Sequence, residues 1–189
     1  MKKEAALLEF VKWFKNASSR LLQLPPDEAA DEIGEHLIER DGRLGVEVAD
    51  EADGTAREMV VTAFSDPEAF QMARYVVNML VGTPGWQVVA LKPARGFAFN
   101  LEVGSRTLDA SQLMYVDLTN GGIGLVVSPQ VFALLPEGRE TEELAWLVVE
   151  GGIGEELAAQ LNHIEFISAP RAGARPIQEL AAHVASRGT

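Results

Sequence analysis

The stretch from Gly82 to Pro93, with the sequence GTPGWQVVALKP, constrains the fold more than any other part of the chain. Gly82 is suited to end a helix in a left-handed conformation, and the Thr-Pro-Gly that follows it is suited to reverse the chain. Residues 86–91 are mostly apolar and predict a strand, which Lys92-Pro93 ends. Because a helical pattern precedes this strand and strand patterns lie on both sides, we expect it near the centre of the fold.

The chain before this stretch predicts two helices, a hairpin and a third helix. Apolar residues recur at helical spacing between Leu7 and Leu21, and Pro25-Pro26 followed by acidic residues indicates the start of a second helix. Alternating residues over 44–48 and a run over 59–64 with apolar residues on both faces predict two strands joined by a hairpin loop. Ser65 and Glu68 have the spacing of a capping box and predict the start of the third helix.

The chain after it predicts more strands and one long helix. Residues 97–103 alternate between apolar and polar, and Asn120-Gly121 predicts a hairpin turn between strands at 113–118 and 123–127. Thr141 is a candidate cap for a helix that Gly151-Gly152 should break or loosen. Residues 163–167 then predict a last strand.

This order favours an α+β fold with a mainly antiparallel sheet and helices packed largely on one face, and it lacks the alternating rhythm of a doubly wound nucleotide-binding fold. At 189 residues the chain is long enough for one substantial core. We expect a single domain over residues 1–168, followed over 169–189 by a linker and a short amphipathic helix that either docks on the domain or stays loose.

The net charge of −12 is unevenly distributed. Residues 1–20 carry five basic and two acidic groups, residues 21–70 carry three basic and fourteen acidic groups, and residues 137–165 carry eight acidic groups and one arginine. Such a surface repels nucleic acid and anionic membranes and attracts a basic protein partner. The alternative is that the acidic residues only maintain solubility.

The chain has no cysteine, which excludes disulfides, thiolate catalysis and zinc sites built on sulfur. No apolar run reaches the roughly 20 residues of a membrane helix, and acidic residues interrupt the N-terminal segment, which makes it a poor signal peptide. These features predict a cytoplasmic protein, and no motif predicts a cofactor.

Three short segments carry a family resemblance: Trp13-Phe14, the run Glu58–Ala63, and Gly85-Trp86 followed by Ala90–Pro93. They resemble a family of uncharacterised bacterial proteins with an E-x-V-x-T-A strand and a G-W-x-x-x-A-x-K-P strand. That family is similar in outline to a domain of unknown function sometimes joined to a ribonuclease E inhibitor-like domain. The resemblance covers about residues 10–168, implies a small bacterial α+β domain, and transfers no catalytic residue.

His163 and Glu165 are the first candidate site residues. They are two apart on a predicted strand, so both side chains should point to the same side, where they suit a metal or a general base with its orienting carboxylate. The alternative is an exposed strand face. The loop Asp50–Gly54 has carboxylates near a glycine, but it lacks the ligand spacing and flanking helices of a calcium loop and reads as a hairpin tip.

Trp86, Lys92 and Arg95 are further candidates for a binding surface. Lys92 and Arg95, with Arg106, flank the predicted central strands and either hold an anion or pair with the excess acid. Trp86 either lines a groove or packs in the core. No catalytic residue and no metal site is assigned.

Three functions remain open. The first is a non-enzymatic, acidic, intracellular protein-binding module of inhibitor or immunity type, which the concentrated charge and the absence of catalytic motifs favour. The second is a metal-assisted hydrolase or other small-molecule enzyme using His163 and Glu165. The third is a self-associating structural domain that forms a homodimer through an edge strand or the helix at 177–184.

Overall fold

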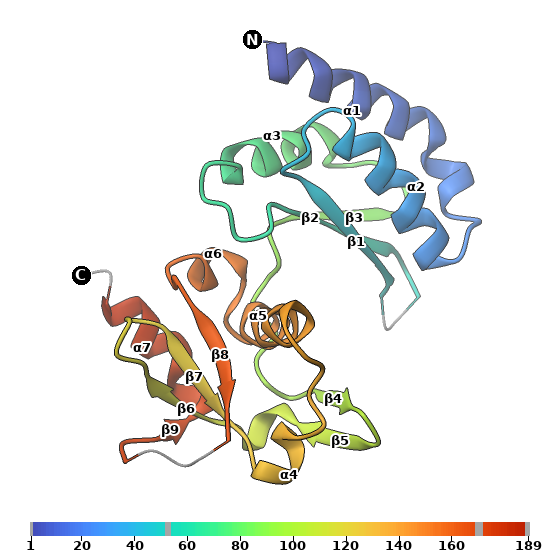
Figure 1. The fold of residues 1–189 in the computed structure, drawn as a ribbon. Coiled ribbons are helices and arrows are strands. Elements are labelled where there is room, and N and C mark those ends of the chain that lie inside the picture. The colour runs from blue at the N-terminus through green and yellow to red at the C-terminus, as the bar shows by residue number, and fades with distance from the viewer. Residues whose placement is uncertain (1, 52–53, 169–171, 188–189) are drawn as a thin grey trace. The chain divides into compact units, whose positions relative to one another are not determined.

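The computed structural model describes residues 2–51, 54–168 and 172–187 (Figure 1). The chain divides into two compact units, Met1–Lys92 and Pro93–Thr189. Both combine helices with a sheet, which confirms the predicted α+β class with mainly antiparallel pairing. We expected one domain over 1–168, whereas the boundary between the compact units falls at the end of the Gly82–Pro93 stretch.

The elements of the first unit are α1 (Lys2–Leu21), α2 (Pro26–Ile38), β1 (Gly45–Asp50), β2 (Arg57–Thr62), α3 (Phe70–Leu80) and β3 (Trp86–Ala90). The strands form one sheet in the order β1-β2-β3. β1 and β2 are antiparallel, as the predicted hairpin requires, and β2 and β3 are parallel because α3 crosses between them. Figure 1 shows the three helices on one side of this sheet.

The strand of the Gly82–Pro93 stretch, β3, lies at the edge of the sheet, so its predicted central position was wrong. The middle strand is β2, which is buried at five of its six positions. Only Trp86 is buried in β3, and Val88, Val89 and Ala90 are half-buried. An apolar run of this length fits a half-covered edge strand as well as a central one, and composition cannot separate the two.

The capping box predicted at Ser65 and Glu68 does not form. Phe64 and Ser65 have φ values of 52° and 58°, in the left-handed region, so the chain turns sharply after β2. The Asp66 side chain instead accepts a hydrogen bond from the backbone N–H of Glu68 at 3.0 Å. The helix α3 begins only at Phe70, without a side-chain cap.

The elements of the second unit are β4 (Asn100–Val103), β5 (Arg106–Asp109), η1 (Ala110–Gln112), β6 (Met114–Asp117), β7 (Ile123–Val126), α4 (Pro129–Phe132), α5 (Arg139–Ile153), α6 (Glu155–Ala158), β8 (Ile164–Ile167), β9 (Arg175–Pro176), η2 (Ile177–Glu179) and α7 (Leu180–Arg187). β4 and β5 form a separate antiparallel pair, and the other strands form a four-stranded sheet in the order β8-β7-β6-β9. The predicted turn at Asn120-Gly121 is confirmed, with Gly121 at a φ of 83°.

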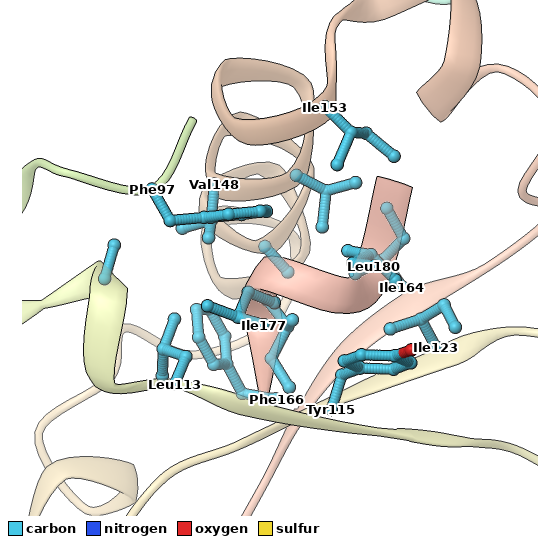
Figure 2. Close-up of a cluster of buried hydrophobic side chains, with 14 of the residues drawn as sticks. Phe97, Leu113, Tyr115, Ile123, Val148, Ile153, Ile164, Phe166, Ile177 and Leu180 are labelled. Carbon is cyan, nitrogen blue, oxygen red and sulfur yellow. The ribbon is translucent and has the colours of Figure 1, made fainter. Parts of the chain in front are cut away.

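The core of the second unit fills the space between the four-stranded sheet and the helices α5 and α7 (Figure 2). The sheet contributes the buried side chains of Tyr115, Ile123, Ile164 and Phe166, which face Val148 and Ile153 of α5 and Ile177 and Leu180 at the C-terminal end. The C-terminal amphipathic helix is therefore docked, with Ile177, Leu180 and Val184 fully buried.

The glycine pair predicted to break the long helix does not do so. α5 continues through Gly151 and Gly152 and ends at Ile153, and the φ of 84° at the following Gly154 is in the left-handed region. Close packing explains Gly152, because a Cβ there would collide with the ring of Phe97. At Gly151 a Cβ would lie 3.8 Å from the ring of Phe99, which is an ordinary contact distance.

The two glycines therefore predict opposite effects of the same substitution. Gly152→Ala should destabilise the second unit by about 1–3 kcal/mol, because the buried Phe97 ring must shift to admit a methyl group. Gly151→Ala should be neutral or stabilising by up to about 1 kcal/mol, because alanine favours a helix interior over glycine. Thermal and urea unfolding of both variants measures the difference. Equal destabilisation by the two substitutions would contradict this packing.

Candidate functional site

A cavity of about 540 Å³ opens in the second unit beside β8. Its walls come from two segments that are distant in sequence, 132–142 and 163–166. It is lined by Phe132, Ala133, Leu135, Pro136, Glu137, Gly138, Thr141, Glu142, His163, Ile164, Glu165 and Phe166. We refer to it as the β8 pocket.

One wall is the connection between α4 and α5, and local hydrogen bonds fix its shape. The Ser128 hydroxyl caps α4 by accepting from the backbone N–H of Val131 at 3.3 Å. Gly138, with a φ of 68°, turns the chain into α5. The Thr141 hydroxyl donates to the Pro136 carbonyl and ties the first turn of α5 to the connection. Thr141 is therefore not the helix cap that the sequence predicted, because α5 starts earlier, at Arg139.

The other wall is β8 with the residue that precedes it. His163 and Glu165 lie on the same side, as their spacing predicted, with 3.6 Å between His163 Nε2 and Glu165 Oε2. Their side chains are 33% and 48% exposed. The alternate residues Ile164 and Phe166 are buried in the core. The side chains of Ile164 and Phe166 therefore face the core, and those of His163 and Glu165 face the other side of β8.

The mouth of the pocket is acidic. Glu137 and Glu142 are exposed on the connection wall, and Glu165 is exposed on β8. No hydrogen bond or ion pair of Glu137 or Glu142 occurs within the part of the chain that the structure describes. The neighbouring Arg139 pairs with Glu143 at 2.7 Å and is not among the lining residues. The lining of the pocket thus includes three carboxylates and one imidazole.

The other predicted site residues, Trp86, Lys92 and Arg95, lie outside the β8 pocket. Trp86 is buried in the first unit, where its Nε1 donates to the Ser18 carbonyl at 3.2 Å. Its ring packs edge-to-face on Phe14, so it is a packing residue. Lys92 Nζ pairs with Glu47 Oε1 at 2.8 Å, in line with the expected neutralisation of excess acid. The backbone N–H of Arg95 bonds the Gly151 carbonyl at 3.0 Å. None of the three lines the β8 pocket.

The described residues contain no set of ligands for a metal ion. Within residues 2–51, 54–168 and 172–187, no group of three or more histidine, aspartate or glutamate side chains is placed to hold a metal ion. His163 and Glu165 therefore supply two ligands without a third. Residues 52 and 53, in the loop compared with a calcium loop, lie outside the described residues.

A second cluster of ionisable groups surrounds Asp117 at the end of β6. Its carboxylate accepts from Arg175 at 2.8 Å, from His183 at 2.7 Å and from Arg187. The Arg175 guanidinium also lies 4.7 Å from the centre of the Tyr115 ring. This Asp117 cluster fastens β9 and α7 to the sheet. Sequence reasoning missed it, because 58 to 70 residues separate Asp117 from its partners and no motif links them.

The contacts of His183 fix its tautomer. A carboxylate only accepts hydrogen bonds, so His183 Nε2 must carry the hydrogen that Asp117 accepts. Nδ1 is then an acceptor for Arg175 Nη1, at 3.1 Å. Arg175 Nη2 lies 3.0 Å from Nε2 and donates to Asp117 at 2.8 Å. Protonation of Nδ1 would remove its bond to Arg175 and bring two cations together. Burial, and secondly the charge of Arg175, lower the pKa of His183 below its ordinary value.

This arrangement predicts that acid weakens the C-terminal attachment. Since the pKa of His183 is lower in the folded chain than in the unfolded chain, its contribution to stability is complete above pH about 6.5 and declines as the pH falls below that value. The free energy of unfolding of wild type should therefore decrease from pH 7.5 to 5 more than that of His183→Gln. Urea unfolding across this range measures the difference. A difference between the two proteins that is independent of pH would contradict the assignment.

None of the helices formed by the described residues is long and apolar enough to cross a membrane. No protein-family model, curated protein or solved structure matches this chain. The resemblance to the uncharacterised bacterial family therefore stays a prediction, and the candidate site rests on its own geometry.

Proposed function

We propose that this chain is a non-enzymatic protein-binding module whose β8 pocket receives a basic segment of a partner protein. The observation that carries this proposal is that three exposed carboxylates, those of Glu137, Glu142 and Glu165, line one pocket. Pockets that bind small molecules and cofactors typically measure about 300–1,000 Å³. At about 540 Å³ this pocket falls within that range.

The sign of the charge at the mouth favours a cation. The N-terminus of α5 contributes roughly half a positive charge, which stabilises acidic residues in its first turn. This effect accounts for Glu142, but it does not account for Glu165, which lies on β8. Three carboxylates also outweigh half a charge, so the local potential is negative and repels anionic ligands.

The charge of the whole chain supports the same partner. Its net charge of −12 attracts basic proteins over a distance of about 8–10 Å in physiological salt and speeds their encounter. Inhibitor and immunity proteins that block basic nucleases or translation factors would use such a charge. We propose that the protein acts in the reducing cytoplasm, where disulfides are rare, and the lack of cysteine agrees with this compartment.

The proposal predicts salt-sensitive binding of basic peptides that depends on the pocket acids. Twelve-residue peptides rich in arginine, lysine and leucine should bind wild type, and Glu137→Gln combined with Glu142→Gln should weaken binding about tenfold, because two carboxylates of the mouth are lost. Fluorescence anisotropy at 25, 150 and 500 mM salt measures this. Glu140→Gln combined with Glu179→Gln is the matched control, since it removes the same charge from two exposed carboxylates of the second unit that do not line the pocket.

Two results would count against the proposal. The first is that no basic peptide binds even at 25 mM salt. The second is that both double variants weaken binding equally, which would show that only the overall charge matters and not the pocket.

A second candidate function is a small-molecule hydrolase, which the pairing of His163 and Glu165 at 3.6 Å inside a pocket favours. In that role His163 would be the general base and Glu165 would orient its ring. It predicts hydrolysis of nitrophenyl esters or phosphates above background, with or without added Mn²⁺. His163→Gln should lower the rate by about a hundredfold or more, the order of magnitude that a general base contributes. Rates equal to those in buffer would argue against this role.

Self-association through the C-terminal helix has less support. The apolar side chains that the sequence offered for it, Ile177, Leu180 and Val184, are all buried in the core of the second unit. A dimer would therefore have to use another surface, such as the free edge of β1 or β3.

A further inference from the structure

We infer that two copies of this chain associate by pairing their β3 strands edge to edge, antiparallel, with Val88 opposite Val88 of the second copy. This inference goes beyond the proposed function, because β3 belongs to the first unit and the β8 pocket belongs to the second. Three features of β3 carry it: its uncharged composition at a sheet edge, the direction of its unpaired backbone groups and the self-complementary spacing of those groups.

β3 has the composition of an interior strand but lies at the edge of its sheet. Proteins keep edge strands from pairing with other chains by placing charged residues or proline on them. Among the described strands that lie at sheet edges, β3 alone carries neither kind of residue. The others carry Glu47 and Asp50 in β1, Glu102 in β4, Arg106 and Asp109 in β5, Glu165 in β8, and Arg175 and Pro176 in β9.

The uncharged stretch extends beyond the strand and favours a second copy as the partner. Residues 75–91 contain no acidic residue, no basic residue and no histidine. A comparable run at 118–136 contains β7, which lies inside its sheet between β8 and β6. Two chains that each carry a net charge of −12 repel each other, so they meet at the lowest electrostatic cost where neither surface is charged. A basic partner, in contrast, would gain no attraction at this edge.

The hydrogen bonds between β2 and β3 show which backbone groups face the free edge. The Arg57 N–H donates to the Gly85 carbonyl at 3.0 Å, and the Leu91 N–H donates to the Val61 carbonyl at 2.8 Å. In a strand the N–H and C=O of one residue point to the same side, and that side alternates along the chain. The odd-numbered residues of β3 therefore bond to β2, and the even-numbered residues face the free edge.

The even-numbered residues offer both donors and acceptors at this edge. Val88 and Ala90 each present an N–H and a C=O. The Trp86 N–H is already bonded to the Thr83 carbonyl at 3.1 Å, so Trp86 presents only its C=O. Within the described part of the chain, no further strand pairs with this edge. Such a row of unpaired groups is a template for a strand from another chain.

The spacing of these groups is complementary to itself. When Val88 lies opposite Val88 of the second copy, each N–H meets the carbonyl of the other across a two-fold axis. On both sides of the axis, the Ala90 N–H then meets the Trp86 carbonyl of the opposite strand. Gln87 lies opposite Val89 of the second copy, at a position without backbone hydrogen bonds. The two three-stranded sheets thus become one continuous sheet, with both β3 strands in its interior.

The residues on either side of β3 direct the chain away from the free edge. Before the strand continues, the ring of Trp86 is buried against Phe14 of α1, which anchors β3 to the helices on one face of the sheet. After the strand the backbone turns at Leu91, which has a φ of 63°. Lys92 Nζ then pairs with Glu47 Oε1 of β1 at 2.8 Å. Since β2 lies between β1 and β3, this pair extends across the sheet and not along the free edge.

The first experiment measures the mass of the full chain by sedimentation equilibrium, at concentrations from about 1 to 300 μM. The mass should rise from 20.5 kDa toward twice that value, with a dissociation constant on the order of 10 μM, because the paired edge is a small interface. Since both copies are acidic, raising the salt from about 25 to 150 mM should tighten the dimer about threefold. A chain that keeps the monomer mass at the highest concentration overturns the inference and leaves the proposed function in place.

The second experiment tests the register by disulfide cross-linking, which the cysteine-free sequence makes possible without background. Chains with Gln87→Cys are mixed with chains with Val89→Cys and oxidised with glutathione disulfide. In the inferred register these positions face each other with Cα atoms about 4.5 Å apart, a distance that a disulfide spans. The mixture should give about tenfold more covalent dimer than either variant alone, because two copies of the same position lie on a diagonal, about 7–8 Å apart.

The control mixture combines Val89→Cys with Ala49→Cys, which places the thiol at an exposed position on β1, the opposite edge of the sheet. It should give no more covalent dimer than the single variants. Gln87 is exposed and Val89 is half-buried, so both substitutions should preserve the fold, which circular dichroism checks. Equal yields from the two mixtures overturn the inference, since they would reflect random collisions. A dimer that forms with concentration but lacks the specific cross-link also overturns it, because its contact lies elsewhere.

Discussion

Burial of the apolar face of α5 against β8 fixes the position of each group in the β8 pocket. Val148 and Ile153 of α5 share the core with Ile164 and Phe166 of β8. Side chains alternate across a strand, so burial of one set holds the other at the surface. The same contact places the first turn of α5 and the connection before it opposite β8. The pocket is thus a consequence of how this helix packs on an edge strand.

The carboxylates of this acidic chain differ in what they contact. Several are paired internally: Asp117 with Arg175, Arg187 and the imidazole of His183, Asp41 with Arg43 at 2.8 Å, and Asp50 with Arg57 at 2.7 Å. Arg57 also donates to the carbonyls of Leu21 and Leu24, so its pairing joins the sheet of the first unit to the end of α1. These acids hold elements together. Among the described residues, Glu137 and Glu142 make no such ion pair, and this contrast is why we propose them for binding.

Much of the local structure could be predicted from the sequence. The hairpin turn at Asn120-Gly121, the start of α2 at Pro26 and the shared orientation of His163 and Glu165 all follow from local conformational preferences. Errors arose where packing overrode those preferences. The glycine pair in α5 is helical because Gly152 makes room for Phe97, and the capping box at Ser65 is lost because the chain turns at Phe64 and Ser65.

The sequence by itself determined the α+β class, the acidic character and the strand periodicity that puts His163 beside Glu165, because these depend on composition and on neighbours along the chain. Only the tertiary structure decided that β3 lies at an edge, that Glu137 and Glu142 share a pocket with Glu165, and that Asp117 meets Arg175, His183 and Arg187. These contacts join residues that are about 20 to 70 positions apart. No local preference encodes them, since they result from which apolar faces are buried together.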